Sequence, residues 1–385
     1  MSKIALSVPS LRGNEWKYIK ECLDTEWVSS AGKYVDLFEQ KMAEYTGAKH
    51  AIACVNGTAA LQLSLRLAGV EPGDEVIVPT LTFIAPINSI IYNGATPLFV
   101  DADEFYNMDS DKTISFIKEC TIFNGGYTFN KKSGKRIRAI VPVHIWGNAV
   151  WLDDLVEICN ERNIAIVEDA SESMGTRYLK GDFSGKHTGT IGKMGCISFN
   201  GNKIITSGGG GMILTDDTHL AEKARYLSTQ AKDDPIRYLH NEVGYNFRLT
   251  NIQAALGLAQ LEQLPGFLAK KRTIYKQYVK RLNGRNAYKM AETPDYSENN
   301  HWLNVLQLDV ATIKGGYEAI MELMTLNNIQ TRPVWGLNHL QVPFKKFQAV
   351  KIDNAIELVE NSLCLPSSVN LTNELINDIC VVLDV

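Results

Sequence analysis

Short apolar segments alternate with amphipathic segments along most of the chain after residue 50. Continuous apolar runs of roughly four to eight residues predict buried strands, whereas apolar residues that recur every three or four positions predict helices. On these patterns we expect strands at 50–55, 75–79, 96–101, 138–144, 164–170, 196–200 and 211–217. Helices are expected at 58–69, 85–92 and 151–163. This alternation predicts an α/β fold, with a mostly parallel central sheet and helices on both of its faces.

The rest of the chain predicts one further helix and then a smaller unit. Thr250 and Gln253 form the pattern of a capping box, so a helix should begin at NIQAALGLAQLEQL. Helical and strand patterns are mixed after this segment. We therefore expect a large domain at 1–267 and a smaller C-terminal α/β domain at 268–385. Residues 119–137 carry Asn-Gly-Gly and Ser-Gly turn signals and predict a hairpin inserted in the large domain.

Composition argues against several classes of protein. The 385 residues carry a formal net charge of −4 without a long run of like charges, which disfavours a nucleic-acid-binding protein. No apolar stretch approaches the roughly 20 residues of a membrane span, and the amino terminus lacks the apolar region of a signal peptide. The seven cysteines form no C-x-x-C pair and the seven histidines form no H-E-x-x-H motif. We expect a cytoplasmic protein that binds no metal, no nucleic acid and no membrane.

Gly57 and Thr58 lie between a predicted strand and the first turn of the next helix, in VNGTAAL. Unpaired backbone N–H groups and the helix dipole make such a position suitable for a phosphate group. A simple strand-to-helix turn explains the same residues equally well. The chain has neither G-x-G-x-x-G nor G-x-x-x-x-G-K-[ST], so dinucleotide and nucleoside-triphosphate loops lose support.

Two carboxylates, Glu168 and Asp169, end a predicted strand in VEDASESMG. Open α/β sheets place functional groups at the carboxyl ends of their strands. A carboxylate at this position could keep the ring nitrogen of a cofactor protonated, ligate a metal or cap the following turn. The residues alone leave all three roles open.

Lys203 stands between Ser198-Phe199 and a run of four glycines. A phosphate-cradling loop, a covalent lysine site and a glycine-rich turn between strands all fit this stretch. Burial disfavours the charged form of a lysine, and an uncharged lysine is nucleophilic enough to form a Schiff base with an aldehyde. The glycines would let the backbone pass close to a bulky cofactor without Cβ clashes.

Together these motifs resemble the nucleotide-sugar aminotransferases of the DegT/StrS type, a branch of the fold type I pyridoxal-phosphate enzymes. The resemblance runs nearly end to end through TEWVSSAGKYVDLFEQKMAEYTG, NGTAAL, PTLTFIAP, VEDASESMG, SFNGNK and GYNFRLTNIQAALGLAQLEQL. Several motifs in the same order are more specific than any one of them. The resemblance implies a fold type I transferase that uses pyridoxal 5'-phosphate, in a homodimer with shared active sites. Dehydratase relatives carry another residue in place of the lysine, so Lys203 implies transamination.

The resemblance also implies roles for individual residues. Lys203 would form the Schiff base with the cofactor and later shuttle a proton, while Asp169 would pair with the pyridine nitrogen. Phe83 would lie against the pyridine ring. The residues implied to hold the phosphate are Gly57, Thr58, Ser198 and, from a second subunit, Asn246. Phe83 could instead be a core residue, Asn246 a turn residue and Ser198 a strand hydroxyl.

The sequence departs from the family pattern at two positions, and a late segment resembles the family's substrate-binding loop. The family's usual glutamine or histidine near the phenolic oxygen of the cofactor is Glu172 here, and Gly209 replaces the glutamate of its G-E-G-G. A carboxylate beside a phenolate repels it unless the carboxylate is protonated or bridged by water. Arg332 and His339, in TRPVWGLNHLQVPF, resemble the late substrate loop, where an arginine suits a diphosphate or a carboxylate. Both residues could equally be ordinary surface loop residues.

The segments SFNGNKII and LCLPSS most resemble one subgroup of the family. That subgroup moves an amino group from glutamate to C4 of a UDP-linked 2-acetamido-4-keto-6-deoxyhexose, in legionaminic or related amino-sugar pathways. The alternatives are a family member that acts on a 3-keto sugar or a keto-cyclitol, and a non-catalytic regulator that keeps the fold. The presence of both Lys203 and Asp169 argues against the regulator, because binding alone requires neither residue.

Overall fold

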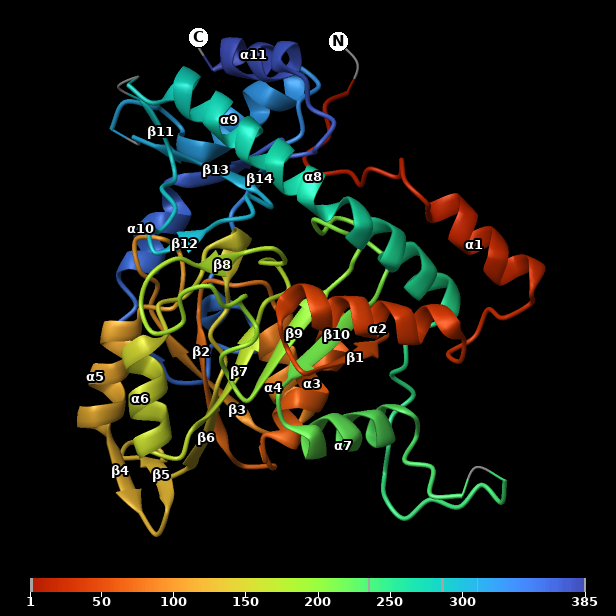
Figure 1. Cartoon of the computed structure of the whole chain (residues 1–385). Coiled ribbons are helices and arrows are strands. Elements are labelled where there is room, and N and C mark those ends of the chain that lie inside the picture. Colours follow the sequence, from red (N-terminus) through yellow and green to blue (C-terminus); the bar gives the residue numbers. More distant parts are fainter. Residues whose placement is uncertain (1–2, 235, 285–286, 310, 384–385) are drawn as a thin grey trace.

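The computed structural model describes residues 3–234, 236–284, 287–309 and 311–383. A ten-stranded sheet with the order β1-β10-β9-β7-β6-β2-β3-β15 lies at its centre, with β4 and β5 joined to it beside β6 (Figure 1). The strands are β1 (His50–Cys54), β2 (Glu75–Pro79), β3 (Thr96–Val100), β4 (Thr121–Asn124), β5 (Tyr127–Asn130), β6 (Arg136–Ile140), β7 (Ala165–Asp169), β9 (Met194–Ser198), β10 (Gly211–Thr215) and β15 (Ala349–Val350).

Most pairs in this sheet are parallel. The strands β9, β7, β6, β2, β3 and β15 run parallel to one another, whereas β10 is antiparallel to both β1 and β9. Because β10 reverses the direction on both sides, β1 points the same way as β9. The carboxyl ends of β1, β2, β7 and β9 therefore lie at one edge of the sheet. The mostly parallel α/β sheet predicted from the sequence is confirmed, and β10 departs from it because no helix separates it from β9.

The helices are α1 (Glu15–Asp24), α2 (Lys33–Thr46), α3 (Gly57–Leu67), α4 (Ala85–Tyr92), α5 (Ser110–Cys120), α6 (Asp153–Glu161), α7 (Thr218–Ser228), α8 (Asn251–Leu282), α9 (Gly316–Leu326), α10 (Asn354–Glu360) and α11 (Asn373–Val382). Two short 3-10 helices are η1 (Ile145–Gly147) and η2 (Asn338–Leu340). None of the helices in the described residues has both the length and the apolar character that crossing a lipid bilayer requires.

Helices cover both faces of the large sheet. On one face α3, α4 and α7 form a continuous apolar core with side chains of the sheet, among them Ile52 and Ile213. On the other face α2 and α8 pack over Ala51 and Ala53 of β1, and α5 and α6 pack over β3, β6 and β7. Neighbouring residues of β1 thus enter different cores, because successive side chains of a strand point to opposite faces. Burial on both faces explains why the strands are continuous apolar runs.

A second sheet, antiparallel throughout, forms in the C-terminal part of the chain. It has the order β11-β13-β16-β14, from β11 (Tyr288–Met290), β13 (Asn304–Leu308), β14 (Arg332–Pro333) and β16 (Ser362–Leu365). The end of α8, together with α9 and α11, packs against it in a separate apolar core. Two shorter strands, β8 (Arg177–Tyr178) and β12 (Ser297–Glu298), pair with each other.

The long helix α8 connects the two sheets. The predicted capping box is confirmed, because the Thr250 side chain accepts from Gln253 N and the Gln253 side chain accepts from Thr250 N. Figure 1 shows α8 running from beside α1 and α2 to the C-terminal helices. The predicted boundary after residue 267 falls inside this helix, so the division into 1–267 and 268–385 stays a prediction.

The C-terminal part also returns to the large sheet. The strand β15 extends the sheet as a parallel neighbour of β3. Directly after β3, the buried Asp101 accepts hydrogen bonds from the N–H groups of Asp353, Asn354 and Ala355 at 2.9 to 3.0 Å. Its carboxylate therefore satisfies the first N–H groups of α10.

The hairpin expected at residues 119–137 is formed by β4 and β5, and it begins where α5 ends at Cys120. Gly125 and Gly126 connect the two strands with φ values of 58° and 82°. A tight hairpin turn of this kind requires positive φ at both central residues, which glycine adopts without steric cost. The strand β5 also pairs with β6, so the hairpin is part of the large sheet.

Candidate active site

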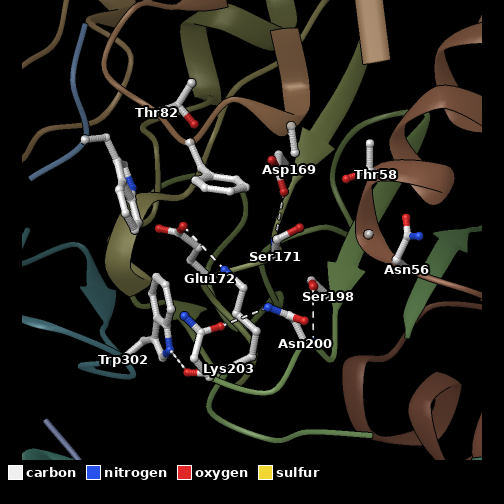
Figure 2. A pocket seen from close by; sticks show the side chains of 15 residues that line it. Asn56, Thr58, Thr82, Asp169, Ser171, Glu172, Ser198, Asn200, Lys203 and Trp302 are labelled. Atoms are coloured by element: carbon white, nitrogen blue, oxygen red, sulfur yellow. Dashed lines mark hydrogen bonds and ion pairs between the residues drawn. The ribbon is translucent and has the colours of Figure 1, made fainter. Parts of the chain in front are cut away.

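A cavity of about 290 Å³ opens at the carboxyl edge of the large sheet (Figure 2). The loops that follow β1, β2, β7 and β9 line it, joined by two tryptophans of the C-terminal part. These loops converge because the four strands point the same way. The lining residues are Asn56, Gly57, Thr58, Thr82, Phe83, Ala85, Asp169, Ser171, Glu172, Ser198, Asn200, Asn202, Lys203, Trp302 and Trp335. Those predicted from the sequence are Gly57, Thr58, Phe83, Asp169, Glu172, Ser198 and Lys203.

The turn between β1 and α3 provides a cradle for an anion. Asn56 is the N-cap of α3, and its side chain accepts a hydrogen bond from Ala59 N at 2.7 Å. Helix geometry leaves the N–H groups of Gly57 and Thr58 without acceptors inside the helix, at the positive end of its dipole. A Cβ added at Gly57 would lie 2.9 Å from Ser198 Cβ, so glycine keeps the space above these donors open. The open space and its donors fit a phosphate group.

The two carboxylates at the end of β7 have different surroundings. Glu168 is fully buried and accepts hydrogen bonds from His144 Nε2 and from three N–H groups of the 189–192 loop, at 2.6 to 2.9 Å. Burial acts to raise the pKa of Glu168, but these hydrogen bonds, that from His144 first, lower it below its ordinary value. Glu168 therefore holds the 189–192 loop in place by hydrogen bonds and does not line the cavity.

Asp169 is the carboxylate that lines the cavity. Its Oδ1 accepts a hydrogen bond from Ser171 N at 3.0 Å. Burial raises the pKa of Asp169, while the hydrogen bonds from Ser171 and the charge of Lys203 act in the opposite direction. A cation beside this carboxylate would stabilise its charged form. A protonated pyridine nitrogen is such a cation, so Asp169 fits the ring of pyridoxal phosphate.

Lys203 lies in the loop after β9, with its amine between Glu172 and Trp302 (Figure 2). Its Nζ is 3.4 Å from Glu172 Oε1 and 3.9 Å from the centroid of the Trp302 ring. The other carboxylate oxygen of Glu172 accepts a hydrogen bond from Trp146 N at 2.9 Å. Burial raises the pKa of Glu172, and the charge of Lys203 opposes this shift. The carboxylate that departs from the family pattern is thus a neighbour of the lysine amine.

Several lining residues were missed in the sequence. Asn200 and Asn202 stand inside SFNGNK, so they could have been found by examining every residue of the motif. Trp302 lies in the C-terminal part and carries no signal of its own, because only the folded chain brings it to this edge. Trp335 stands inside TRPVWGLNHLQVPF, so it could have been found by examining every residue of that stretch. The Trp335 ring packs against Phe83, with centroids 5.5 Å apart.

Arg332 lies outside this cavity but close to it. It lines a neighbouring cavity of about 460 Å³, which shares Phe83, Asn202 and Trp335 with the first. The guanidinium is exposed at the end of a strand and donates to Thr331 O at 3.0 Å. The structure therefore places Arg332 in a cavity beside the predicted site rather than in it.

His339 and Asn246 line neither cavity. His339 Nδ1 is 2.7 Å from Thr80 Oγ1, and burial lowers the pKa of this imidazole. Asn246 is exposed and pairs through its backbone with Thr229. Contact between Asn246 and a phosphate would require a second subunit, so its role stays a prediction, as does that of His339.

The glycine run near Lys203 serves the backbone rather than the cavity. Residues 208–211 do not line the cavity. A Cβ added at Gly211 would lie 2.5 Å from the backbone of Asn56, so glycine lets β10 approach the turn that holds Gly57. A Cβ added at Gly209 would meet only Gln253 Nε2, at 3.5 Å. The expectation that the glycines make room for a cofactor stays a prediction.

Taken together, the sheet and the residues at its carboxyl edge define a fold type I transferase that depends on pyridoxal phosphate. The sequence matches the DegT/DnrJ/EryC1/StrS aminotransferase family over residues 9–384, and the chain belongs to this family. The predicted family and cofactor are thereby confirmed, and the chain is a sugar aminotransferase.

Curated relatives and solved structures resemble the whole chain. GDP-perosamine synthase of Caulobacter vibrioides is 38% identical, over 100% of this chain and 98% of the relative. The putative pyridoxal phosphate-dependent aminotransferase EpsN of Bacillus subtilis is 36% identical, over 97% and 92%. A DegT DnrJ EryC1 StrS aminotransferase from Brucella abortus has a TM-score of 0.86 and 26% identity, covering 96% of this chain and 94% of its own. These names do not include the predicted UDP-acetamido-sugar subgroup.

Proposed function

We propose that this enzyme moves an amino group from glutamate to the keto carbon of a nucleotide-linked sugar. The observation that carries the proposal is the convergence of Lys203, Asp169 and the open start of α3 in one cavity. Pyridoxal phosphate, when bound, supplies an electron sink for the carbon that gains or loses the amino group. A non-catalytic regulator would require neither a lysine amine nor a buried carboxylate at this position.

The residues of the cavity support separate parts of this reaction. Asp169 would keep a proton on the ring nitrogen, because a buried carboxylate strongly favours a neighbouring positive charge. Lys203 Nζ would hold the aldehyde carbon and, once free, carry a proton to and from the reacting carbon. Phe83 would cover the ring. The proposed phosphate-binding residues are Gly57, Thr58 and Ser198, with Asn246 contributed by a second subunit of a homodimer.

The neighbouring cavity supports a phosphorylated acceptor. It joins the first at Phe83 and Trp335, and the guanidinium of Arg332 can bind two phosphate oxygens at once. Two acceptors are supported by different observations. SFNGNKII and LCLPSS favour a UDP-linked 2-acetamido-4-keto-6-deoxyhexose, aminated at C4, whereas the relatives favour the GDP-linked keto sugar that would yield GDP-perosamine.

The first half of the reaction can be tested without knowing the sugar. Purified protein loaded with pyridoxal phosphate should absorb in the visible range, and glutamate should abolish this band while 2-oxoglutarate forms. Borohydride reduction before the addition of glutamate, followed by peptide mapping, should place the pyridoxyl group on Lys203. Labelling of Lys193 or another lysine instead would contradict the assignment of the lysine.

The acceptor is tested by competition. Protein that carries the cofactor as pyridoxamine phosphate is mixed with equal amounts of the two nucleotide sugars, and the products are identified by mass spectrometry. Exchange of the ketone for an amine on one sugar alone identifies the acceptor. Amination of neither sugar, together with rapid amination of a keto-cyclitol, would refute a nucleotide-sugar substrate.

A further inference from the structure

Trp302 contacts the amine of Lys203 and also the peptide bond that precedes this lysine. Its ring lies 3.9 Å from the Lys203 amine, and its Nε1–H donates to Asn202 O at 2.7 Å, on the peptide that precedes the lysine. Glu172 Oε1 lies 3.4 Å from the same amine. The lysine side chain is only 13% exposed, so little water competes for its charge. An aromatic face and a carboxylate thus form a pocket for an ammonium group within the active site.

Trp302 is itself fixed by buried hydrogen bonds. Its N–H donates to Asn300 Oδ1 at 2.8 Å, and Asn300 Nδ2 donates to Glu172 O at 2.9 Å. The carbonyl oxygen of Trp302 accepts a hydrogen bond from Lys271 Nζ at 2.8 Å. Asn300 therefore couples the backbone of Trp302 to that of Glu172, the two residues whose side chains contact the Lys203 amine.

The identity of Glu172 points to charge rather than to packing. A glutamine would accept the hydrogen bond from Trp146 N equally well. Only a carboxylate also provides a counter-charge for the ammonium of Lys203. Burial of Glu172 is costly, which raises its pKa, and the lysine is the positive group that opposes this shift.

We propose that Glu172 and Trp302 form a resting site for the Lys203 amine while it is detached from the cofactor. This rests on the proposed function, in which the lysine alternates between an attached and a free state. On attachment, Nζ forms a C=N bond with the aldehyde carbon and the aldehyde oxygen leaves as water. When the donor, in its ammonium form, takes over that carbon, the three protons of its nitrogen pass to Nζ, which leaves as an ammonium group. The resting site stabilises this free lysine and its charged form.

Loss of a residue that contacts the cofactor would weaken the binding of pyridoxal phosphate, whereas loss of the resting site should have the opposite effect on the preference between the two cofactor forms. Pyridoxal phosphate draws Lys203 out of the resting site, whereas pyridoxamine phosphate cannot attach and leaves it there. Loss of the Trp302 ring should therefore favour pyridoxal phosphate over pyridoxamine phosphate. A cation–π contact of about 1 to 2 kcal/mol in a largely buried site corresponds to a ~5- to 30-fold change in the ratio of the two dissociation constants.

The test measures both dissociation constants on the cofactor-free full-length chain of Trp302→Leu. Trp335→Leu is the matched control: Trp335 lines the same cavity and lies beside Phe83 and Trp302, with ring centroids 5.5 and 6.5 Å away, but Trp302 is the ring that the lysine amine contacts. The ratio should shift toward pyridoxal phosphate in Trp302→Leu and stay at the wild-type value in the control. Trp302→Phe, which keeps a smaller ring, should show a lesser shift and serves if the leucine variant does not fold.

Glu172→Gln provides an independent measurement, because it removes the counter-charge and keeps an acceptor for Trp146 N. Its ratio should shift in the same direction. An unchanged ratio in both Trp302→Leu and Glu172→Gln, accompanied by lowered thermal stability, would overturn the resting site and leave these residues a packing role. Borohydride labelling of another lysine in the wild type would instead refute the assigned role of Lys203, so the two failures are distinguishable.

Discussion

Replacement of Gly57 by alanine tests the phosphate cradle with the addition of a single methyl group. The new Cβ would lie 2.9 Å from Ser198 Cβ and 3.3 Å from the Oγ atoms of Ser198 and Ser171. Carbon atoms in contact prefer about 3.5 to 4.0 Å. Ser198 or the start of α3 must therefore move by several tenths of an ångström, and both belong to the proposed phosphate site.

Such a shift weakens hydrogen bonds from the first N–H groups of α3 to the phosphate. A hydrogen bond to a charged group contributes about 1.5 to 3 kcal/mol, so the loss of one corresponds to ~10- to 150-fold weaker binding of pyridoxal phosphate. Helix propensity acts in the other direction, because alanine is favoured over glycine inside a helix by at most about 1 kcal/mol. The cofactor-free variant should therefore unfold at nearly the wild-type temperature.

The assay is a titration of the cofactor-free protein with pyridoxal phosphate, combined with thermal unfolding of the same sample. Gly209→Ala is the matched control, since its Cβ would meet only Gln253 Nε2 at 3.5 Å. The control should bind the cofactor as the wild type does. Wild-type affinity in Gly57→Ala would refute the phosphate cradle, and an equal loss in both variants would show that the effect is not specific to the start of α3.

Three further predictions concern the polar residues Asp169, Lys203, Asn246 and Glu168. Asp169→Asn should fold but lose most single-turnover activity with glutamate, since a neutral amide does not hold the ring nitrogen protonated; near wild-type turnover would make Asp169 a turn cap. Asn246→Asp and Lys203→Ala should each be inactive, yet co-refolding should restore activity in hybrid dimers with one intact site; verified but inactive hybrids would place Asn246 in its own subunit. Glu168→Gln should cost about 1.5 to 3 kcal/mol in urea unfolding at pH 7. Because the folded pKa of Glu168 is lowered, this difference is present above its ordinary value of 4.5 and should shrink as the pH falls through the folded pKa; a constant difference would contradict the hydrogen-bond account.

Much of the large sheet could be predicted because its signals are local. The segments β2 and α4 have the bounds expected from their apolar patterns, since Asp74 and Thr80 flank β2, and Pro86 and Gly94 mark the two ends of α4. The expected strand at 138–144 ends earlier, at Ile140, because Pro142 has no N–H to continue the ladder. An apolar run in the sequence indicates which residues are buried, but it does not indicate where the hydrogen bonds between strands end.

Tertiary packing decided what the sequence alone could not. Pro265 removes one backbone hydrogen bond and favours a helix end, yet α8 continues to Leu282. Leu264, Phe267 and Leu268 on either side of it are buried in the core over the large sheet, which compensates for the missing bond. Trp302 was missed for the same reason, because its place beside the lysine depends on chain segments far apart in the sequence.

The motif residues of the site were predictable because they stand where strands end. Asp169 and Ser198 close β7 and β9, and Gly57 opens α3 directly after β1, so a parallel sheet must bring them together. Arg332 begins the two-residue strand β14 and His339 lies in the short helix η2, and no apolar pattern in the sequence predicts either element. The resemblance could suggest their chemistry but not their distance from the cavity.

The return of the C-terminal part to the large sheet limits how hybrid enzymes can be built from this chain. A graft that exchanges everything after residue 267 for the segment of a relative would also exchange β15, the strand beside β3. It would separate Asp101 from the backbone of residues 353–355, which that carboxylate holds. A graft confined to residues 288–333 would leave this edge of the host sheet intact, but host β16 would then have to pair with β13 and β14 of the relative.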